Sequence, residues 1–259
     1  MENKSIGFIG GGRITKIILQ AFKNSNLMFK EIIVFDPNKD ILTKLKNDYD
    51  YIKAENVNIE STAKCDIIFL AIHPPLISET LIKIKPFLNE DSIIVSLAPK
   101  ITIEKMKELL NGSTSIVRVN PCATAIINQG INPVSFSGSM SKEKKESLIF
   151  LLSHLGKTFE IEENKIEAYA MISAMGPTYF WFQLQQLKEL ALSYGFEENE
   201  AKEIISEMIK GTLNTLFYSN MPPEEVMDLI PVKPLGEYED NIKSYYSDKL
   251  NSIYRKIKP

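Results

Sequence analysis

The stretch SIGFIGGGRIT, residues 5–15, decides the fold of this chain. It is a short apolar run that ends in three consecutive glycines, and apolar residues then recur at helical spacing. A strand, a glycine-rich turn and a helix in this order are the context that a dinucleotide-binding fingerprint requires. The first glycine allows the tight turn, the second lets the backbone approach a pyrophosphate, and the helix N-terminus attracts negative charge. We therefore predict a dinucleotide-binding loop, the alternative being a turn whose glycines serve packing alone; its residues would be Gly10, Gly11, Gly12, Arg13 and Ile14.

The second apolar run, residues 31–36, ends on an acid, Asp36. Asp36 lies about 20 residues beyond the glycines, where the fingerprint places the acid that accepts the ribose 2′-hydroxyl. A carboxylate there also repels a 2′-phosphate, so Asp36 favours NAD over NADP. Lys39 is close enough in sequence to offset that repulsion. The alternative role for Asp36 is a cap of the turn before Pro37.

Apolar runs of the same kind continue along the first part of the chain and alternate with helical patterns. The predicted strands are residues 5–10, 31–36, 66–72, 92–97, 115–119 and 133–136. Strands that are apolar throughout imply a parallel sheet with helices on both faces. The predicted fold class is therefore α/β, with a Rossmann-type doubly wound sheet. Because ligands bind at the carboxyl ends of such strands, we expect Ala71 and His73 to contact the cofactor.

The strand patterns stop near residue 161, and long helical patterns replace them over residues 166–194, 198–218 and 241–257. We predict a dinucleotide-binding domain at 1–161 and an all-helical domain at 162–259 for dimerisation and substrate binding. The stretch 166–196 carries more apolar residues than one helix face buries against a neighbouring domain. A homodimer or higher homo-oligomer is the expected result.

Composition excludes several other classes. The formal net charge of −3 gives no basic surface for nucleic acid. Two cysteines, Cys65 and Cys122, make no disulfide framework, which favours a reducing compartment, the cytoplasm. No apolar stretch is long enough to predict a membrane span, and no ligand spacing predicts a metal site.

Four segments resemble the pyrroline-5-carboxylate reductase family, in its order and spacing: residues 6–12, 66–74, 117–121 and 173–179. They resemble its opening glycine motif, its fourth-strand signature, its Arg-Val-Met-Pro segment and its Ser-Gly-Ser-Gly-Pro-Ala-Tyr segment. The resemblance implies a Rossmann domain, a helical domain interlocked with a second subunit, and hydride transfer from NADH or NADPH to a cyclic imine in proline biosynthesis. It also implies that Cys122 and Gly176 lie at the substrate.

The family's substrate loop, Ser-Pro-Gly-Gly-Thr-Thr, aligns with residues 233–238 but is changed here. The resemblance implies that this loop holds the substrate carboxylate, and Lys233 is the residue that could bind it or could instead neutralise Glu237. We expect Tyr238 to contact the imine nitrogen and Glu237 to stabilise the positive charge of a protonated imine. Glu237 stands where the family has a hydroxyl donor. Two carboxylates about 4 Å apart repel by about 4 kcal/mol at an effective dielectric constant near 20. An altered substrate is therefore expected.

Two other functions remain open. One is a dehydrogenase of a hydroxy or amino acid, for which Lys165 is the candidate catalytic lysine. The other is a non-catalytic, dinucleotide-binding regulatory or interaction protein on the same fold, and the altered loop fits this alternative equally well.

Overall fold

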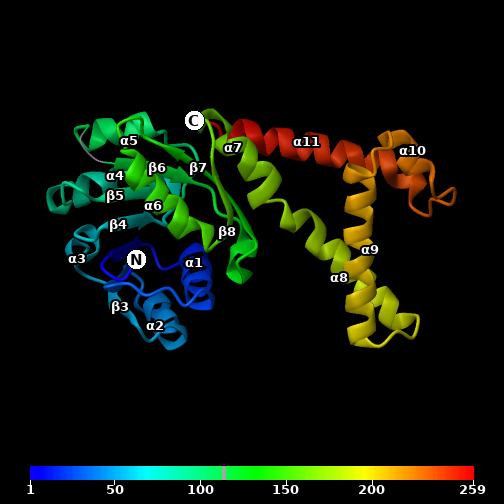
Figure 1. Ribbon diagram of the computed structural model, residues 1–259, viewed down its shortest axis with the longest axis horizontal. Coiled ribbons are helices and arrows are strands. Elements are labelled where there is room, and N and C mark those ends of the chain that lie inside the picture. The colour runs from blue at the N-terminus through cyan, green and yellow to red at the C-terminus, as the bar shows by residue number, and fades with distance from the viewer. Residues whose placement is uncertain (113–114) are drawn as a thin grey trace. The chain divides into compact units, whose positions relative to one another are not determined.

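The computed structural model describes residues 1–112 and 115–259 (Figure 1). The chain divides into two compact units. The sheet unit consists of Met1–Met175 together with Tyr254–Pro259, and the helical unit is Gly176–Ile253. The units thus divide after residue 175, and the domain boundary after residue 161 stays a prediction.

Within the described residues, eight strands form one sheet in the order β3-β2-β1-β4-β5-β6-β7-β8. The first six follow the order of a dinucleotide-binding Rossmann sheet and are parallel. The strands are β1 (Ser5–Ile9), β2 (Glu31–Phe35), β3 (Ile52–Glu55), β4 (Ile67–Leu70), β5 (Ile93–Ser96), β6 (Ser115–Val119), β7 (Gly130–Phe136) and β8 (Gly156–Glu160).

The expectation of a wholly parallel sheet is wrong for the last two strands, because β7 runs antiparallel to β6 and β8 runs parallel to β7. The connection between β6 and β7, residues 120–129, is shorter than the dozen or so residues that a parallel crossover needs. β3 and β8, which the sequence did not predict, are the two edge strands.

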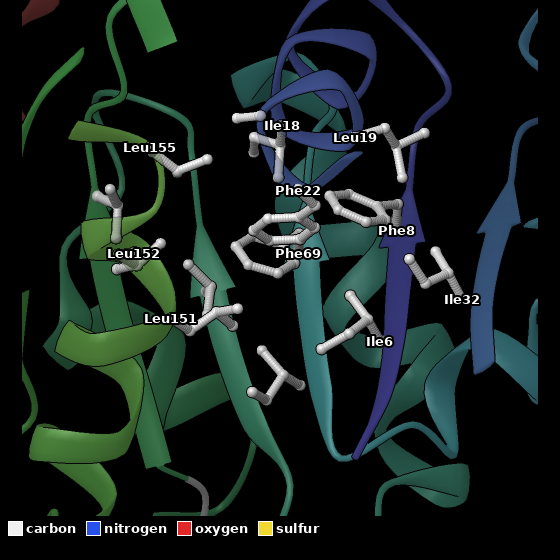
Figure 2. Close-up of a cluster of buried hydrophobic side chains, with 14 of the residues drawn as sticks. Ile6, Phe8, Ile18, Leu19, Phe22, Ile32, Phe69, Leu151, Leu152 and Leu155 are labelled. Atoms are coloured by element: carbon white, nitrogen blue, oxygen red, sulfur yellow. The ribbon is translucent and has the colours of Figure 1, made fainter. Parts of the chain in front are cut away.

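Helices cover both faces of the sheet, as predicted. Successive strand residues alternate between two buried clusters: Phe8 and Phe69 lie in one, and Ile9 and Leu70 in the other. Figure 2 shows the first cluster, in which the rings of Phe8 and Phe69 stack with centroids 4.8 Å apart. The helices of the sheet unit are α1 (Arg13–Asn24), α2 (Lys39–Asp48), α3 (Glu60–Ala63), α4 (Pro74–Ile84), α5 (Ile103–Leu109), α6 (Lys142–Ser153) and α7 (Ile166–Tyr169). The first cluster includes residues of α1, α2 and α6, and the second residues of α3, α4 and α5.

The helical unit has almost no core of its own. It contains α8 (Pro177–Ser193), α9 (Glu198–Tyr218), α10 (Pro223–Asp228) and most of α11 (Glu239–Ile257). Among the described residues of these four helices, Ala201 is the single buried one. Large apolar side chains are exposed instead, Phe182 to 68% and Phe217 to 65%. An exposed apolar surface of this extent marks an interface with a partner.

Candidate functional site

The glycine loop joins β1 to α1, and its first glycine cannot be replaced. Gly10 has a φ of +103°, and a Cβ there would lie 2.4 Å from the carbonyl oxygen of Ala71. The Gly10 N–H donates to the carbonyl of Phe35 at 2.7 Å. Thr15, in the third small position of the motif, donates its hydroxyl to the Gly10 carbonyl at 2.6 Å. The loop is therefore fixed against β2 and against the end of β4.

The other two glycines have different surroundings. A Cβ on Gly11 would lie 2.9 Å from Cγ2 of Ile41, so Gly11 allows α2 to pack against the loop. Gly12 precedes α1 with a φ of −73°, and a Cβ there would meet nothing within 4 Å. Open backbone at the N-terminus of a helix is the arrangement that binds a phosphate. Arg13 is exposed in the first turn, whereas Ile14 packs against the buried cluster beneath it.

Asp36 is turned toward the loop. One carboxylate oxygen, Oδ2, accepts from the Gly11 N–H at 2.8 Å, and Oδ1 accepts from the Asn38 N–H at 2.8 Å. The residue is 9% exposed. Asp36 therefore holds the loop and the start of α2 in place. Its predicted contact with a ribose stays a prediction.

The end of β4 lies beside the glycine loop, because β1 and β4 are neighbours and Ile9 pairs with Leu70. The Ala71 N–H donates to the Ile9 carbonyl at 2.8 Å. His73 is the exposed N-cap residue of α4 and precedes two prolines. The structure thus brings Gly10, Asp36 and Ala71 together, with His73 two residues further on.

Both cysteine thiols, those of Cys65 and Cys122, are buried and make hydrogen bonds within the protein. Cys122, after β6, donates to the Ser173 carbonyl at 3.1 Å and accepts from the Thr124 hydroxyl at 3.2 Å. Ser173 belongs to a π-helical turn, Ala170–Ala174, that leads to Gly176. Burial raises the pKa of the Cys65 thiol to about 12. The predicted substrate contact of Cys122 stays a prediction, as does that of Gly176, which has ordinary helical backbone.

The predicted substrate loop lies in the helical unit and is exposed throughout. A 3₁₀ turn spans Gly236–Tyr238, and the Gly236 N–H donates to the Lys233 carbonyl at 3.0 Å. The Tyr238 N–H donates to the Leu235 carbonyl, also at 3.0 Å. Glu237 therefore lies within a short local turn.

The structure also contains a buried cluster of charged side chains that was not predicted from the sequence. Arg118 on β6 is 1% exposed and donates to the carboxylates of Glu163, at 3.0 Å, and Glu167. Glu163 also accepts from the Ile103 N–H at 2.7 Å. The cluster ties β6 and α5 to α7. An arginine in an otherwise apolar strand was the available signal, but its partners come more than forty residues later in the chain.

Two other kinds of site, a membrane-spanning helix and a metal centre, are absent from the described residues. None of the helices placed in the structure is long and apolar enough to cross a membrane. Over the same residues, no group of three or more histidine, cysteine or acidic side chains has the arrangement of a metal site.

Two protein-family models match different parts of the chain. Residues 5–100 match the family model described as NADP oxidoreductase coenzyme F420-dependent. Residues 163–237 match the model described as pyrroline-5-carboxylate reductase dimerisation.

Curated relatives match most of the chain. Pyrroline-5-carboxylate reductase of Haemophilus influenzae is 26% identical and is aligned over 82% of this chain and 78% of its own length. Pyrroline-5-carboxylate reductase 2 of Bacillus subtilis is 26% identical, over 93% of this chain and 86% of its own.

Solved structures share the fold. That of the Plasmodium falciparum pyrroline carboxylate reductase with NADP bound has a TM-score of 0.82 at 24% identity, covering 100% of this chain and 98% of that one. The Streptococcus pyogenes 1-pyrroline-5-carboxylate reductase has a TM-score of 0.80 at 20% identity, covering 100% and 99%.

Proposed function

Because the chain belongs to the pyrroline-5-carboxylate reductase family, we propose that it reduces the carbon–nitrogen double bond of a cyclic imine with NADH or NADPH. The observation that carries this proposal is the open backbone at Gly12, at the N-terminus of α1. It fits the pyrophosphate of a dinucleotide, because a side chain there would occupy the space that the phosphates need.

The reduced nicotinamide supplies the hydride when it is bound, and the protein supplies position and electrostatics. Gly12 and the first turn of α1 would hold the pyrophosphate, and Asp36 fixes the conformation of the glycine loop. Ala71 and His73, which follow β4, would contact the nicotinamide ribose. These roles are supported by the position of each residue at the carboxyl ends of β1, β2 and β4.

For the substrate, we infer that the loop at residues 233–238 provides the polar contacts. Tyr238 contacts the imine nitrogen, Glu237 stabilises the positive charge of a protonated imine, and Lys233 binds a carboxylate. A protonated imine needs no strong general acid. The support is the exposure of all three side chains together with the family alignment.

The functional unit is proposed to be a homodimer formed through the helical unit. The matching dimerisation model and the exposed apolar side chains of α8 and α9 support this assembly. A cytoplasmic location and a preference for NADH stay predictions.

The test is a turnover assay of the full-length protein with each cofactor, using pyrroline-5-carboxylate and a cyclic imine without a carboxylate. Oxidation of the cofactor that depends on an imine supports the proposal. Cofactor binding without turnover of either imine would instead support the non-catalytic alternative, which the altered loop fits as well as it fits a new substrate. Absence of binding by both cofactors would refute the proposal.

A further inference from the structure

A cavity lies at the edge of the sheet opposite the glycine loop. It has a volume of about 320 Å³ and lies at the amino end of β2, beside the end of α1 and the connection at residues 25–30. Tyr51, just before β3, forms part of its wall. The glycine loop and Asp36 lie at the carboxyl ends of β1 and β2, which is the edge where an open α/β sheet binds its main ligand. The cavity is therefore separate from the proposed dinucleotide site.

The walls of the cavity are mainly aromatic and aliphatic. The rings of Phe22 and Phe29 have their centroids 5.1 Å apart at an interplanar angle of 47°, and Tyr51 supplies a third ring. The aliphatic lining residues are Leu27, Met28 and Ile32. Phe22 and Ile32 are buried, whereas Met28 and Tyr51 are exposed at the rim. Since ligand sites have volumes of about 300–1,000 Å³, this cavity fits a ligand with a single planar ring system.

The cavity is formed by backbone that is held in place. Asn26 has a φ of +51°, in the left-handed region that asparagine tolerates, and its N–H donates to the Lys23 carbonyl at 3.1 Å. On the other side, the Tyr51 hydroxyl donates to the Leu19 carbonyl at 3.4 Å. The walls therefore have a defined conformation without a ligand.

Two lysines line the cavity, Lys23 and Lys30. Neither forms an ion pair within residues 1–112 and 115–259. Lys23 Nζ donates to the Asp48 carbonyl at 3.2 Å, which uses one of its three N–H groups. Both ammonium groups therefore have donors left for an anion.

The groups that would oppose an anion are neutralised or uncharged. Glu31, the acid in the lining, forms an ion pair with Lys53 at 2.7 Å. Burial raises the pKa of Tyr51 to about 12, so its phenol is uncharged at neutral pH. The cavity thus combines ring walls with an excess of positive charge.

We propose that this cavity binds a small aromatic carboxylate. Its ring packs against Phe22, Phe29 and Tyr51. Its carboxylate accepts hydrogen bonds from Lys23 and Lys30. Because the site lies at the opposite edge of the sheet, the proposal holds whether or not the chain reduces an imine.

The experiment is fluorine NMR of 4-fluorobenzoate with the full-length protein, in which line broadening gives the affinity. Two probes of similar shape, the neutral 4-fluorobenzamide and the cationic 4-fluorobenzamidine, separate the effect of the charge from that of the ring. The benzoate should bind about threefold more tightly than the benzamide, or better, as expected for exposed ion pairs. The benzamidine should bind most weakly.

Substitutions locate the site. Lys23→Gln and Lys30→Gln should each weaken benzoate binding by about twofold to fivefold and leave benzamide binding unchanged. The matched control is Lys46→Gln, an exposed lysine on α2 outside the cavity, which should change neither. Tyr51→Ala should weaken both probes by about tenfold, because a ring wall is lost.

Equal binding of the benzoate and the benzamide would overturn the proposal, as would benzoate binding that is unchanged in Lys30→Gln. Displacement by NADPH, or loss of binding in Lys233→Gln, would also overturn it, because the benzoate would then occupy the cofactor or substrate site. Failure of the proposed function looks different, since imine turnover would be absent while benzoate binding persists. Thermal denaturation shows whether each variant is folded, and the exposed Lys30 keeps the test decisive if Tyr51→Ala does not fold.

Discussion

Replacing Gly12 with valine should abolish dinucleotide binding while leaving the protein folded. The backbone at Gly12 has a φ of −73°, which any residue adopts, and a Cβ there meets nothing within 4 Å. The cost to folding is therefore limited to a less favourable helix N-cap, about 1 kcal/mol. The added side chain instead fills the space in front of the first turn of α1.

The loss of affinity follows from the hydrogen bonds that the pyrophosphate could no longer make. Hydrogen bonds to a charged group contribute about 1.5–3 kcal/mol each. If the side chain displaces the phosphates from two N–H groups, the affinity falls by about 3–6 kcal/mol, on the order of a hundredfold to ten-thousandfold. Fluorescence titration with NADPH and NADH measures this loss, and thermal denaturation measures the stability.

Two other glycines serve as controls. Gly138 is equally open, so Gly138→Val should bind both cofactors as the wild type does. Gly10→Ala should instead destabilise the protein, because its Cβ would lie 2.4 Å from the Ala71 carbonyl oxygen. A folded Gly12→Val variant with unchanged affinity for both cofactors would refute the assignment of this loop.

Three further predictions concern the fold, the substrate loop and the assembly. Glu167→Gln should lower the free energy of unfolding by about 3 kcal/mol, because it leaves the buried Arg118 poorly paired. Glu163→Gln should lower it by less, since the Glu163 side chain is 29% exposed. Equal losses for the two variants in denaturant titrations would contradict this prediction. Glu237→Thr should lower KM for pyrroline-5-carboxylate, because it removes a charge that repels the carboxylate, and should change KM less for an imine without one; steady-state kinetics that show lower activity would assign Glu237 to binding instead. Phe182→Asp should weaken the dimer, as measured by light scattering. Phe150→Asp should not, because Phe150, although also exposed, lies on α6 in the sheet unit. A wild-type protein that is monomeric at micromolar concentration would exclude the dimer.

The central part of the sheet could be predicted because its strands are buried on both faces. Their sequences are continuous apolar runs, such as IIFL in β4 and IIVS in β5. The edge strands lack this signal. β3 reads IKAE and β8 reads GKTFE, so polar residues interrupt the apolar ones, and each strand is paired on one side only. Strand direction in β7 depends on the length of a connection rather than on any local pattern.

The glycine loop was also predictable, because local steric demands determine it. The orientation of Asp36 was not. A carboxylate at the end of β2 has the same sequence signature whether it faces a ribose or the N–H groups of Gly11 and Asn38. The partners of Arg118 depend on tertiary packing between distant segments, which no local spacing encodes.

The near absence of buried side chains in the helical unit links folding to concentration. Among the described residues of its four helices Ala201 is the single buried one, so in the proposed homodimer this unit would gain its apolar burial from the second copy. Dilution should therefore promote unfolding as well as dissociation, and the midpoint of thermal unfolding should rise with protein concentration. Exchange of subunits would require the helices to give up that burial, so newly made chains would pair with each other more readily than with chains in existing dimers.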